Sequence, residues 1–146
     1  MSASGIAVFD KTLQTTNIWL DEIMEHQGPD RQRAWHILSA VLHTLRDRLS
    51  ADLSAHLSAQ LPLLVRGTYY DQYEPSRQPV QSRTLDEFLG RVKEELAFTR
   101  PVDAKEAVQT VFHVLSHHLD PGEVRKIRES LPQDIRALWP DPTQRQ

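Results

Sequence analysis

The sequence predicts an all-α protein: two similar halves that pack together as one domain. Three observations support this prediction. The 146 residues are 39% hydrophobic and 25% charged, which is ordinary for a globular domain with one core. Apolar residues recur every three or four positions, and no segment alternates with a period of two for long. Finally, the segment 41–49 returns 70 residues later as the segment 111–119.

This repeat extends in both directions and predicts a tandem duplication. At the same offset of 70 residues the matches are Leu57 with Ile127, Leu61-Pro62 with Leu131-Pro132, Val65-Arg66 with Ile135-Arg136, and Tyr69 with Trp139. At an offset of 69 residues, Trp19-Leu20 and Ile23 match Phe88-Leu89 and Val92. We therefore expect two three-helix units, at about 9–67 and 84–139. They should share one core, because a unit of that size would be marginal alone.

Helices are expected wherever the apolar stripe follows the 3.6-residue period and a start signal precedes it. The expected helices cover residues 9–26, 31–49, 51–60, 84–97, 103–118 and 121–130. Four N-cap residues begin helices in this scheme, namely Ser50, Thr84, Asp103 and Asp120. Asp120 is followed by a proline, which suits the first helical position because no N–H is needed there.

Two prolines interrupt the pattern at matching places in the halves. Pro62 and Pro132 cannot lie inside a helix, so short helical turns are expected over 62–67 and 132–138. Gly67 is a plausible stop for the first turn.

The segment 68–83 has two prolines and no periodicity, which indicates a linker between the repeats. It also has three tyrosines, namely Tyr69, Tyr70 and Tyr73. Aromatic side chains bury a large area when packed, so we expect the linker to lie against the helices.

Composition excludes several classes of function. The chain has no cysteine, which excludes disulfides, thiol nucleophiles, iron–sulfur clusters and the common structural zinc sites. No apolar run approaches the roughly 18 residues that a membrane helix needs. The start of the chain has no signal-peptide pattern. We therefore expect a cytoplasmic protein without a membrane partner.

Charge is unevenly distributed along the chain. Seventeen basic and twenty acidic residues give a net charge of −3. Residues 1–30 have one lysine and five acids, a net charge of −4, whereas residues 31–66 have five arginines and two acids, a net charge of +3. Nucleic-acid binders usually have a positive net charge and a basic stripe. We therefore expect no nucleic-acid partner, and Arg31–Arg66 is the only region that would support one.

Histidines are the most conspicuous potential ligands. At 100° per residue, His43 and His113 occupy matched positions that point away from the apolar stripe. His113 and His117 have the four-residue spacing of a helical metal clamp. However, Val114 stands where a zinc protease needs a glutamate, and the sequence offers no clear third ligand. We expect no metal and no cofactor, with His113 and His117 as a weak surface candidate.

Catalytic residues are not evident. The carboxylate pairs lie among charged neighbours on predicted helices, as solvated helix faces do, and no serine has the Gly-x-Ser-x-Gly context of a hydrolase. We therefore expect that the protein is not an enzyme.

Three arginines and two tyrosines are the best candidates for a ligand or partner patch. Arg46 and Arg48 are expected at the edges of the buried face of their helix. Arg66 lies close in sequence to Tyr69 and Tyr70. Such arginines either brace carboxylates and carbonyl ends or receive an anionic ligand.

Several motifs, taken together, resemble one family. They are Leu45-Arg46-Asp47-Arg48-Leu49, Ala59-Gln60-Leu61-Pro62, Val65-Arg66-Gly67-Thr68-Tyr69-Tyr70, Pro121-Gly122-Glu123, Leu131-Pro132, Leu138-Trp139, Phe9-Asp10-Lys11 and Trp19-Leu20. Over residues 8–140 the chain resembles the bacterial domain-of-unknown-function family 2267. The resemblance implies a small all-helical bacterial protein and brings no catalytic residues with it.

Three classes of function are compatible with these features. The first is an interaction or adaptor protein, with a protein partner or a second copy of the chain bound to a duplicated helical scaffold. The second is a sensor of a small ligand or anion, with a pocket between the halves near Arg46, Arg66 and Tyr69. The third, less favoured, is nucleic-acid binding. The absence of catalytic motifs favours the first class.

Overall fold

The chain folds into α-helices joined by short connections. The computed structural model describes residues 4–80 and 84–140, and within them there are eight α-helices, one short 3-10 helix and no strand. The elements are α1 (Ala7–Gln27), α2 (Arg31–Arg48), α3 (Ala51–Ala59), α4 (Leu63–Tyr70), η1 (Pro75–Arg77), α5 (Leu85–Glu95), α6 (Ala104–His118), α7 (Pro121–Ser130) and α8 (Gln133–Arg136). None of the helices in these described parts is long and apolar enough to cross a membrane.

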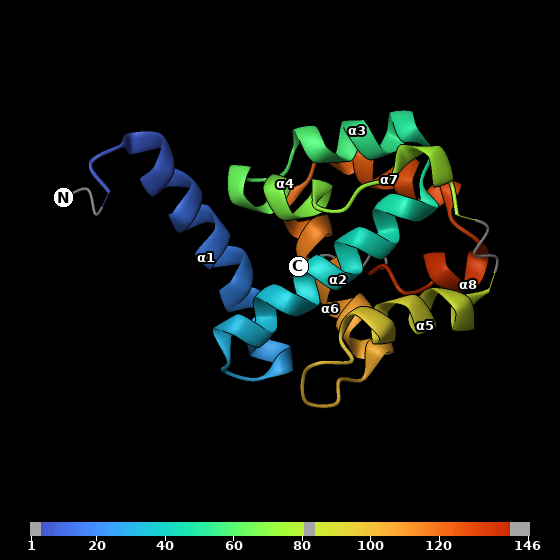
Figure 1. The fold of residues 1–146 in the computed structure, drawn as a ribbon. Helices are drawn as coiled ribbons and strands as arrows, with labels where there is room; N and C mark the ends of the chain where they lie inside the picture. Colours follow the sequence, from blue (N-terminus) through green and yellow to red (C-terminus); the bar gives the residue numbers. More distant parts are fainter. Residues whose placement is uncertain (1–3, 81–83, 141–146) are drawn as a thin grey trace.

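Helices α2 and α6 form the centre of the molecule (Figure 1). Helix α2 contacts α1, α4, α5 and α6, and helix α6 contacts α1, α2, α5 and α7. Helix α3 packs on α4 and α7, and α8 packs on α5. One continuous hydrophobic core results, with contributions from both halves of the chain.

The predicted helices and caps are confirmed. Each of the six predicted helices is present with its ends within two residues of the expected positions. The side chains of Ser50, Thr84, Asp103 and Asp120 each accept a hydrogen bond from the backbone N–H three residues later. Helix α1 ends at Gln27 and is followed by Gly28, whose φ of 97° suits a residue without a side chain.

Helix α4 is longer than the predicted turn. It begins after Pro62, as expected, but it continues through Gly67 and ends at Tyr70, so the first three residues of the predicted linker are helical. The reason is a contact between α4 and another helix. The Tyr69 side chain is fully buried, and its hydroxyl donates a hydrogen bond of 2.9 Å to the Ser54 carbonyl. Because this contact holds Tyr69 in place, the helix continues past Gly67, where a glycine would have allowed it to end.

The described part of the linker lies against the helices, as predicted. The Tyr73 ring lies 5.1 Å from the Arg46 guanidinium carbon. Further along, the Gln78 side-chain amide donates a hydrogen bond of 2.6 Å to the Arg46 carbonyl, and the Val80 N–H donates one of 2.7 Å to the Asp47 carbonyl. Residues 81–83 of the predicted linker lie outside the described residues.

Two arginines 70 residues apart make the same set of hydrogen bonds. Arg66 Nε donates to the Ser58 carbonyl at 2.9 Å, and its Nη2 donates to the Leu61 carbonyl at 3.0 Å. Arg136 donates from the same atoms to the Arg128 and Leu131 carbonyls, at 2.9 and 3.0 Å. Each arginine thus satisfies carbonyl groups left open at the end of the preceding helix.

Substitution at the centre of the core tests this architecture. Leu45 on α2 and Leu115 on α6 have no exposed surface. We expect Leu45→Ala or Leu115→Ala to lower the free energy of unfolding by about 2–5 kcal/mol, because each leaves a cavity in the packed interface. Chemical denaturation followed by circular dichroism measures the change. Ile18→Ala is the control, since Ile18 is 51% exposed, and it should change stability by about 0.5 kcal/mol or less.

Candidate functional site

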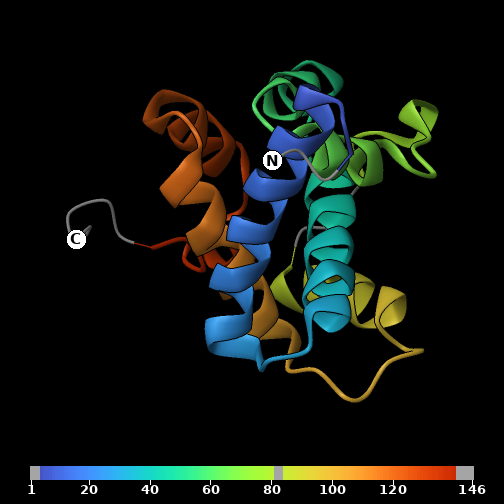
Figure 2. The same ribbon diagram turned by 90° about the vertical axis from the view of Figure 1, so that its left-hand side faces the viewer.

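The N-terminal half of α1 projects from the body of the molecule (Figures 1 and 2) and has several exposed apolar side chains. Residues at positions 9, 13, 16, 20 and 23 are three or four apart, so they follow one line along the helix, and the N-cap residue Ile6 comes three positions before Phe9. Thr16, Leu20 and Ile23 on this line are buried against the rest of the chain. Ile6, Phe9 and Leu13 on the same line are 48%, 49% and 45% exposed. We refer to Ile6, Phe9 and Leu13 as the exposed stripe.

Helix α4 extends the apolar surface beside α1. Leu63 and Leu64 are 49% and 41% exposed, and the Leu64 N–H donates a hydrogen bond of 3.1 Å to the Thr12 hydroxyl. A groove of about 450 Å³ lies beside this contact, and residues of α1, the start of α4 and His118 of α6 line it, Val8 and Leu63 among them. The sequence pattern alone did not single out this surface. The three-four spacing was visible there, but which half of the stripe is covered depends on where α2 and α6 end.

The predicted arginine patch is mostly internal. Arg46 is buried, and its Nη1 donates to the Tyr69 carbonyl at 2.7 Å and to the Asp71 carbonyl at 3.0 Å, while its Nε donates to Asp47 at 2.8 Å. Arg46 therefore braces the end of α4. Arg48 is half-buried near the end of α2.

The other members of the patch lie around α4. Arg66 is half-buried, bonds the carbonyls described above and also lines the groove beside α1. Tyr69 belongs to the core, and burial raises the pKa of its hydroxyl. Tyr70 is 38% exposed and donates a hydrogen bond of 2.7 Å to the Ser58 hydroxyl. Arg66 therefore reaches the groove beside α1 and Tyr70 reaches the solvent, whereas Tyr69 is fully buried.

One pocket between the halves has a mixed charge. It lies between α2 and α5 and encloses about 220 Å³, and its charged residues are His43, Arg46, Asp47, Arg91, Glu94 and Glu95. Asp47 already bonds both Arg46 and Arg91, at 2.8 and 3.1 Å. Arg66 and Tyr69, which were expected there with Arg46, do not line it.

The prediction that His43 points outward is wrong. His43 is 8% exposed, because α2 is packed on both faces and its outer ridge is covered by α4 and α5. Its Nδ1 lies 2.6 Å from Glu95 Oε1, and its Nε2 lies 2.6 Å from the Thr68 carbonyl oxygen. Both partners accept hydrogen bonds, so the doubly protonated ring fits this site.

The pKa of His43 is raised above its ordinary value of 6.5. Burial disfavours the charged ring and alone would lower the pKa. The hydrogen bonds to Glu95 and to the Thr68 carbonyl, with the negative charge of Glu95, outweigh burial and the repulsion from Arg46.

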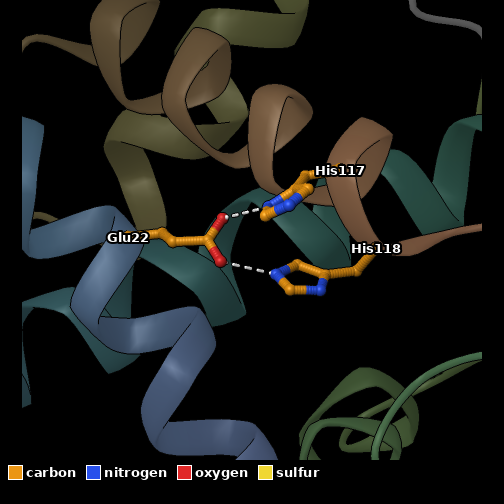
Figure 3. A group of neighbouring side chains, drawn as sticks. All are labelled: Glu22, His117 and His118. Atoms are coloured by element: carbon orange, nitrogen blue, oxygen red, sulfur yellow. Dashed lines mark hydrogen bonds and ion pairs between the residues drawn. The ribbon is translucent and has the colours of Figure 1, made fainter. Parts of the chain in front are cut away.

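Two adjacent histidines at the end of α6 face a glutamate of α1 (Figure 3). His117 Nδ1 lies 2.9 Å from Glu22 Oε1, and His118 Nε2 lies 2.6 Å from Glu22 Oε2. The two imidazole rings are 4.4 Å apart, and the His118 ring stacks on Trp19 at 5.1 Å. The sequence could not reveal this cluster, because Glu22 is 95 residues from His117.

His113 and His117, which were predicted as a pair, belong to two different sites. His113 is exposed, as expected, and lines a groove with His26, Gln27 and Glu106. His117 is exposed too, but it belongs to the cluster with Glu22 and His118.

Fold and surface define a compact all-helical protein with a projecting first helix. The model of the family DUF2267, described as an uncharacterized conserved protein, matches residues 16–138. The chain belongs to this family, and the resemblance seen in its motifs is confirmed. No curated protein matches the chain.

The buried His43 predicts a pH-dependent stability. Because its pKa is higher in the folded than in the unfolded state, its contribution is fully present below pH 6.5 and is lost as the pH rises through the folded pKa. We expect His43→Gln to be less stable than the native chain at low pH, and this difference to shrink as the pH rises. Urea denaturation at a series of pH values measures it.

His113→Gln is the matched control, because His113 is exposed. Its stability should follow the native pH profile. A difference between His43→Gln and the native chain that stays constant with pH would contradict the assigned role of His43.

Proposed function

We propose that this protein is a non-catalytic interaction protein that self-associates through the exposed stripe of α1. The observation that carries the proposal is the continuity of that stripe with a buried one. Ile6, Phe9 and Leu13 extend the line of Thr16, Leu20 and Ile23, yet about half of each of their side chains is exposed. Contiguous exposed apolar surface of this kind marks interaction sites in soluble proteins.

The spacing of the stripe suits another helix. Residues that recur three and four positions apart pack as a seam between two helices. A second copy offers the same seam, and a two-fold axis near residue 9 sets Ile6 of one chain opposite Leu13 of the other. Phe9 then packs at the centre. A contact of this kind is isologous, the commonest symmetry of soluble dimers.

Charge is compatible with self-association at this place. Asp10 and Lys11 are the two charged residues between positions 4 and 18, so this part of α1 has no net charge. Two copies therefore meet without the like-charge repulsion that weakens contacts between identical surfaces.

The competing hypothesis, a sensor of a small anion, has less support. The two arginines of the pocket between α2 and α5 are already paired with Asp47, and acidic side chains line the same space. An entering anion would have to break these bonds and would face Glu94 and Glu95.

We also propose that the chain arose by duplication. The repeated unit would have four helices, one more than the three predicted from the sequence. The order α1 to α4 parallels the order α5 to α8, and the matched bonds of Arg66 and Arg136 support an equivalence of the two units. The first helix is the element in which the units differ most, since α1 has 21 residues and α5 has 11. This extension of α1 bears the exposed stripe.

Sedimentation equilibrium of the full-length chain tests the proposed self-association. We expect the native chain to be a dimer at micromolar concentration. Phe9→Glu should weaken the dimer by about tenfold or more, because it buries a charge at the centre of the seam. Leu13→Glu should act in the same direction.

Ile18→Glu is the matched control, since Ile18 is exposed on the same helix but away from the stripe. It should leave the dimer intact. A native chain that sediments as a monomer would overturn the proposal, and equal effects of Ile18→Glu and Phe9→Glu would place the contact elsewhere. Circular dichroism verifies that each variant is folded.

A further inference from the structure

Glu22, His117 and His118 form a set of metal donors that the proposed function does not use. One donor atom from each residue lies within 4.8 Å of the other two. The residues come from helices α1 and α6, which are in contact, so the set is assembled by the tertiary fold. We propose that these three side chains bind one divalent transition-metal ion, with zinc as the ion that best fits them.

The chemistry of the donors selects the class of ion. Two imidazole nitrogens and one carboxylate oxygen are the protein ligands of many three-ligand zinc sites, in which water completes the tetrahedron. Calcium and magnesium prefer sites made of oxygen atoms alone. The two histidines therefore favour zinc and its transition-metal neighbours over the hard cations.

The observed distances are compatible with coordination. Ligands about 2.0–2.1 Å from zinc at tetrahedral angles lie about 3.3 Å from one another. The histidine nitrogens now lie 2.9 and 2.6 Å from the oxygens of Glu22. The pairs need to separate by less than about 1 Å, which small side-chain rotations supply. The ion would take the place of the two contacts that now join these groups.

A stacking contact orients one ligand of the site, and the site is open to solvent on one side. The His118 ring stacks on Trp19 with an angle of 18° between the planes, which restricts the orientation of its nitrogens. Trp19 is itself buried in the core. The His117 side chain is 60% exposed, whereas Glu22 and His118 are 20% and 23% exposed. An ion can therefore enter from solvent on the side of His117.

Titration of the full-length chain with zinc chloride, followed by calorimetry, tests the proposal. We expect one zinc ion to bind per chain. Glu22→Gln and His118→Gln should each lower the association constant at least tenfold, because each removes one of three ligands. Glu22→Gln keeps the size of the side chain and one oxygen acceptor, so the contact between α1 and α6 is conserved.

His113→Gln is the matched control. His113 lies four residues before His117 on α6, the spacing of a metal clamp on one helix, but it is not a member of the cluster. The control should bind zinc with native affinity. Zinc should also raise the melting temperature of the native chain and of His113→Gln, and raise that of Glu22→Gln much less.

Two outcomes would overturn the inference. One is a native chain that binds no zinc at protein concentrations of calorimetry. The other is binding that survives Glu22→Gln but is lost in His113→Gln, which would assign the ion to a clamp on α6 alone. Phe9→Glu should bind zinc like the native chain, so the result is independent of self-association.

Discussion

The packing of α2 against α6 is the contact on which the rest of the molecule depends. These two helices lie at the centre, and the other six contact them directly or through one neighbour. Leu45 on α2 and Leu115 on α6 are 70 residues apart, and both are fully buried in the core. Because the pair is covered on several sides, polar residues on α2 must also be buried. Each of them then needs a partner inside the protein.

The buried polar groups of α2 connect it to the second half of the chain and to α4. Arg46 bonds the backbone at the end of α4, and His43 joins Glu95 on α5 to the Thr68 carbonyl on α4. These bonds satisfy groups that would otherwise destabilise the core. Arg46 and His43, two residues that stood out in the sequence as potential ligands, are therefore occupied in holding the helices together.

The two halves of helix α1 lie in different environments. Its C-terminal half packs on α2 and α6, and Glu22 there meets the histidines of α6. Its N-terminal half extends beyond both helices, and Ile6, Phe9 and Leu13 there are about half exposed. One helix thus offers both the surface proposed for self-association and a ligand of the proposed metal site. The two features are separated along the helix, since Leu13 and Glu22 are nine residues apart.

Local patterns were enough to predict the helices, their caps and the all-helical class, because periodicity and capping depend on residues within a few positions of one another. They failed where distant segments decide the environment. His43 has an outward position on its own helix, but α4 and α5 cover it. Gly67 permits a helix to stop, but the buried Tyr69 carries α4 onward. Glu22 and His118 became neighbours only when α1 packed on α6. Burial and long-range pairing are properties of the packed helices together, so only the tertiary structure could decide them.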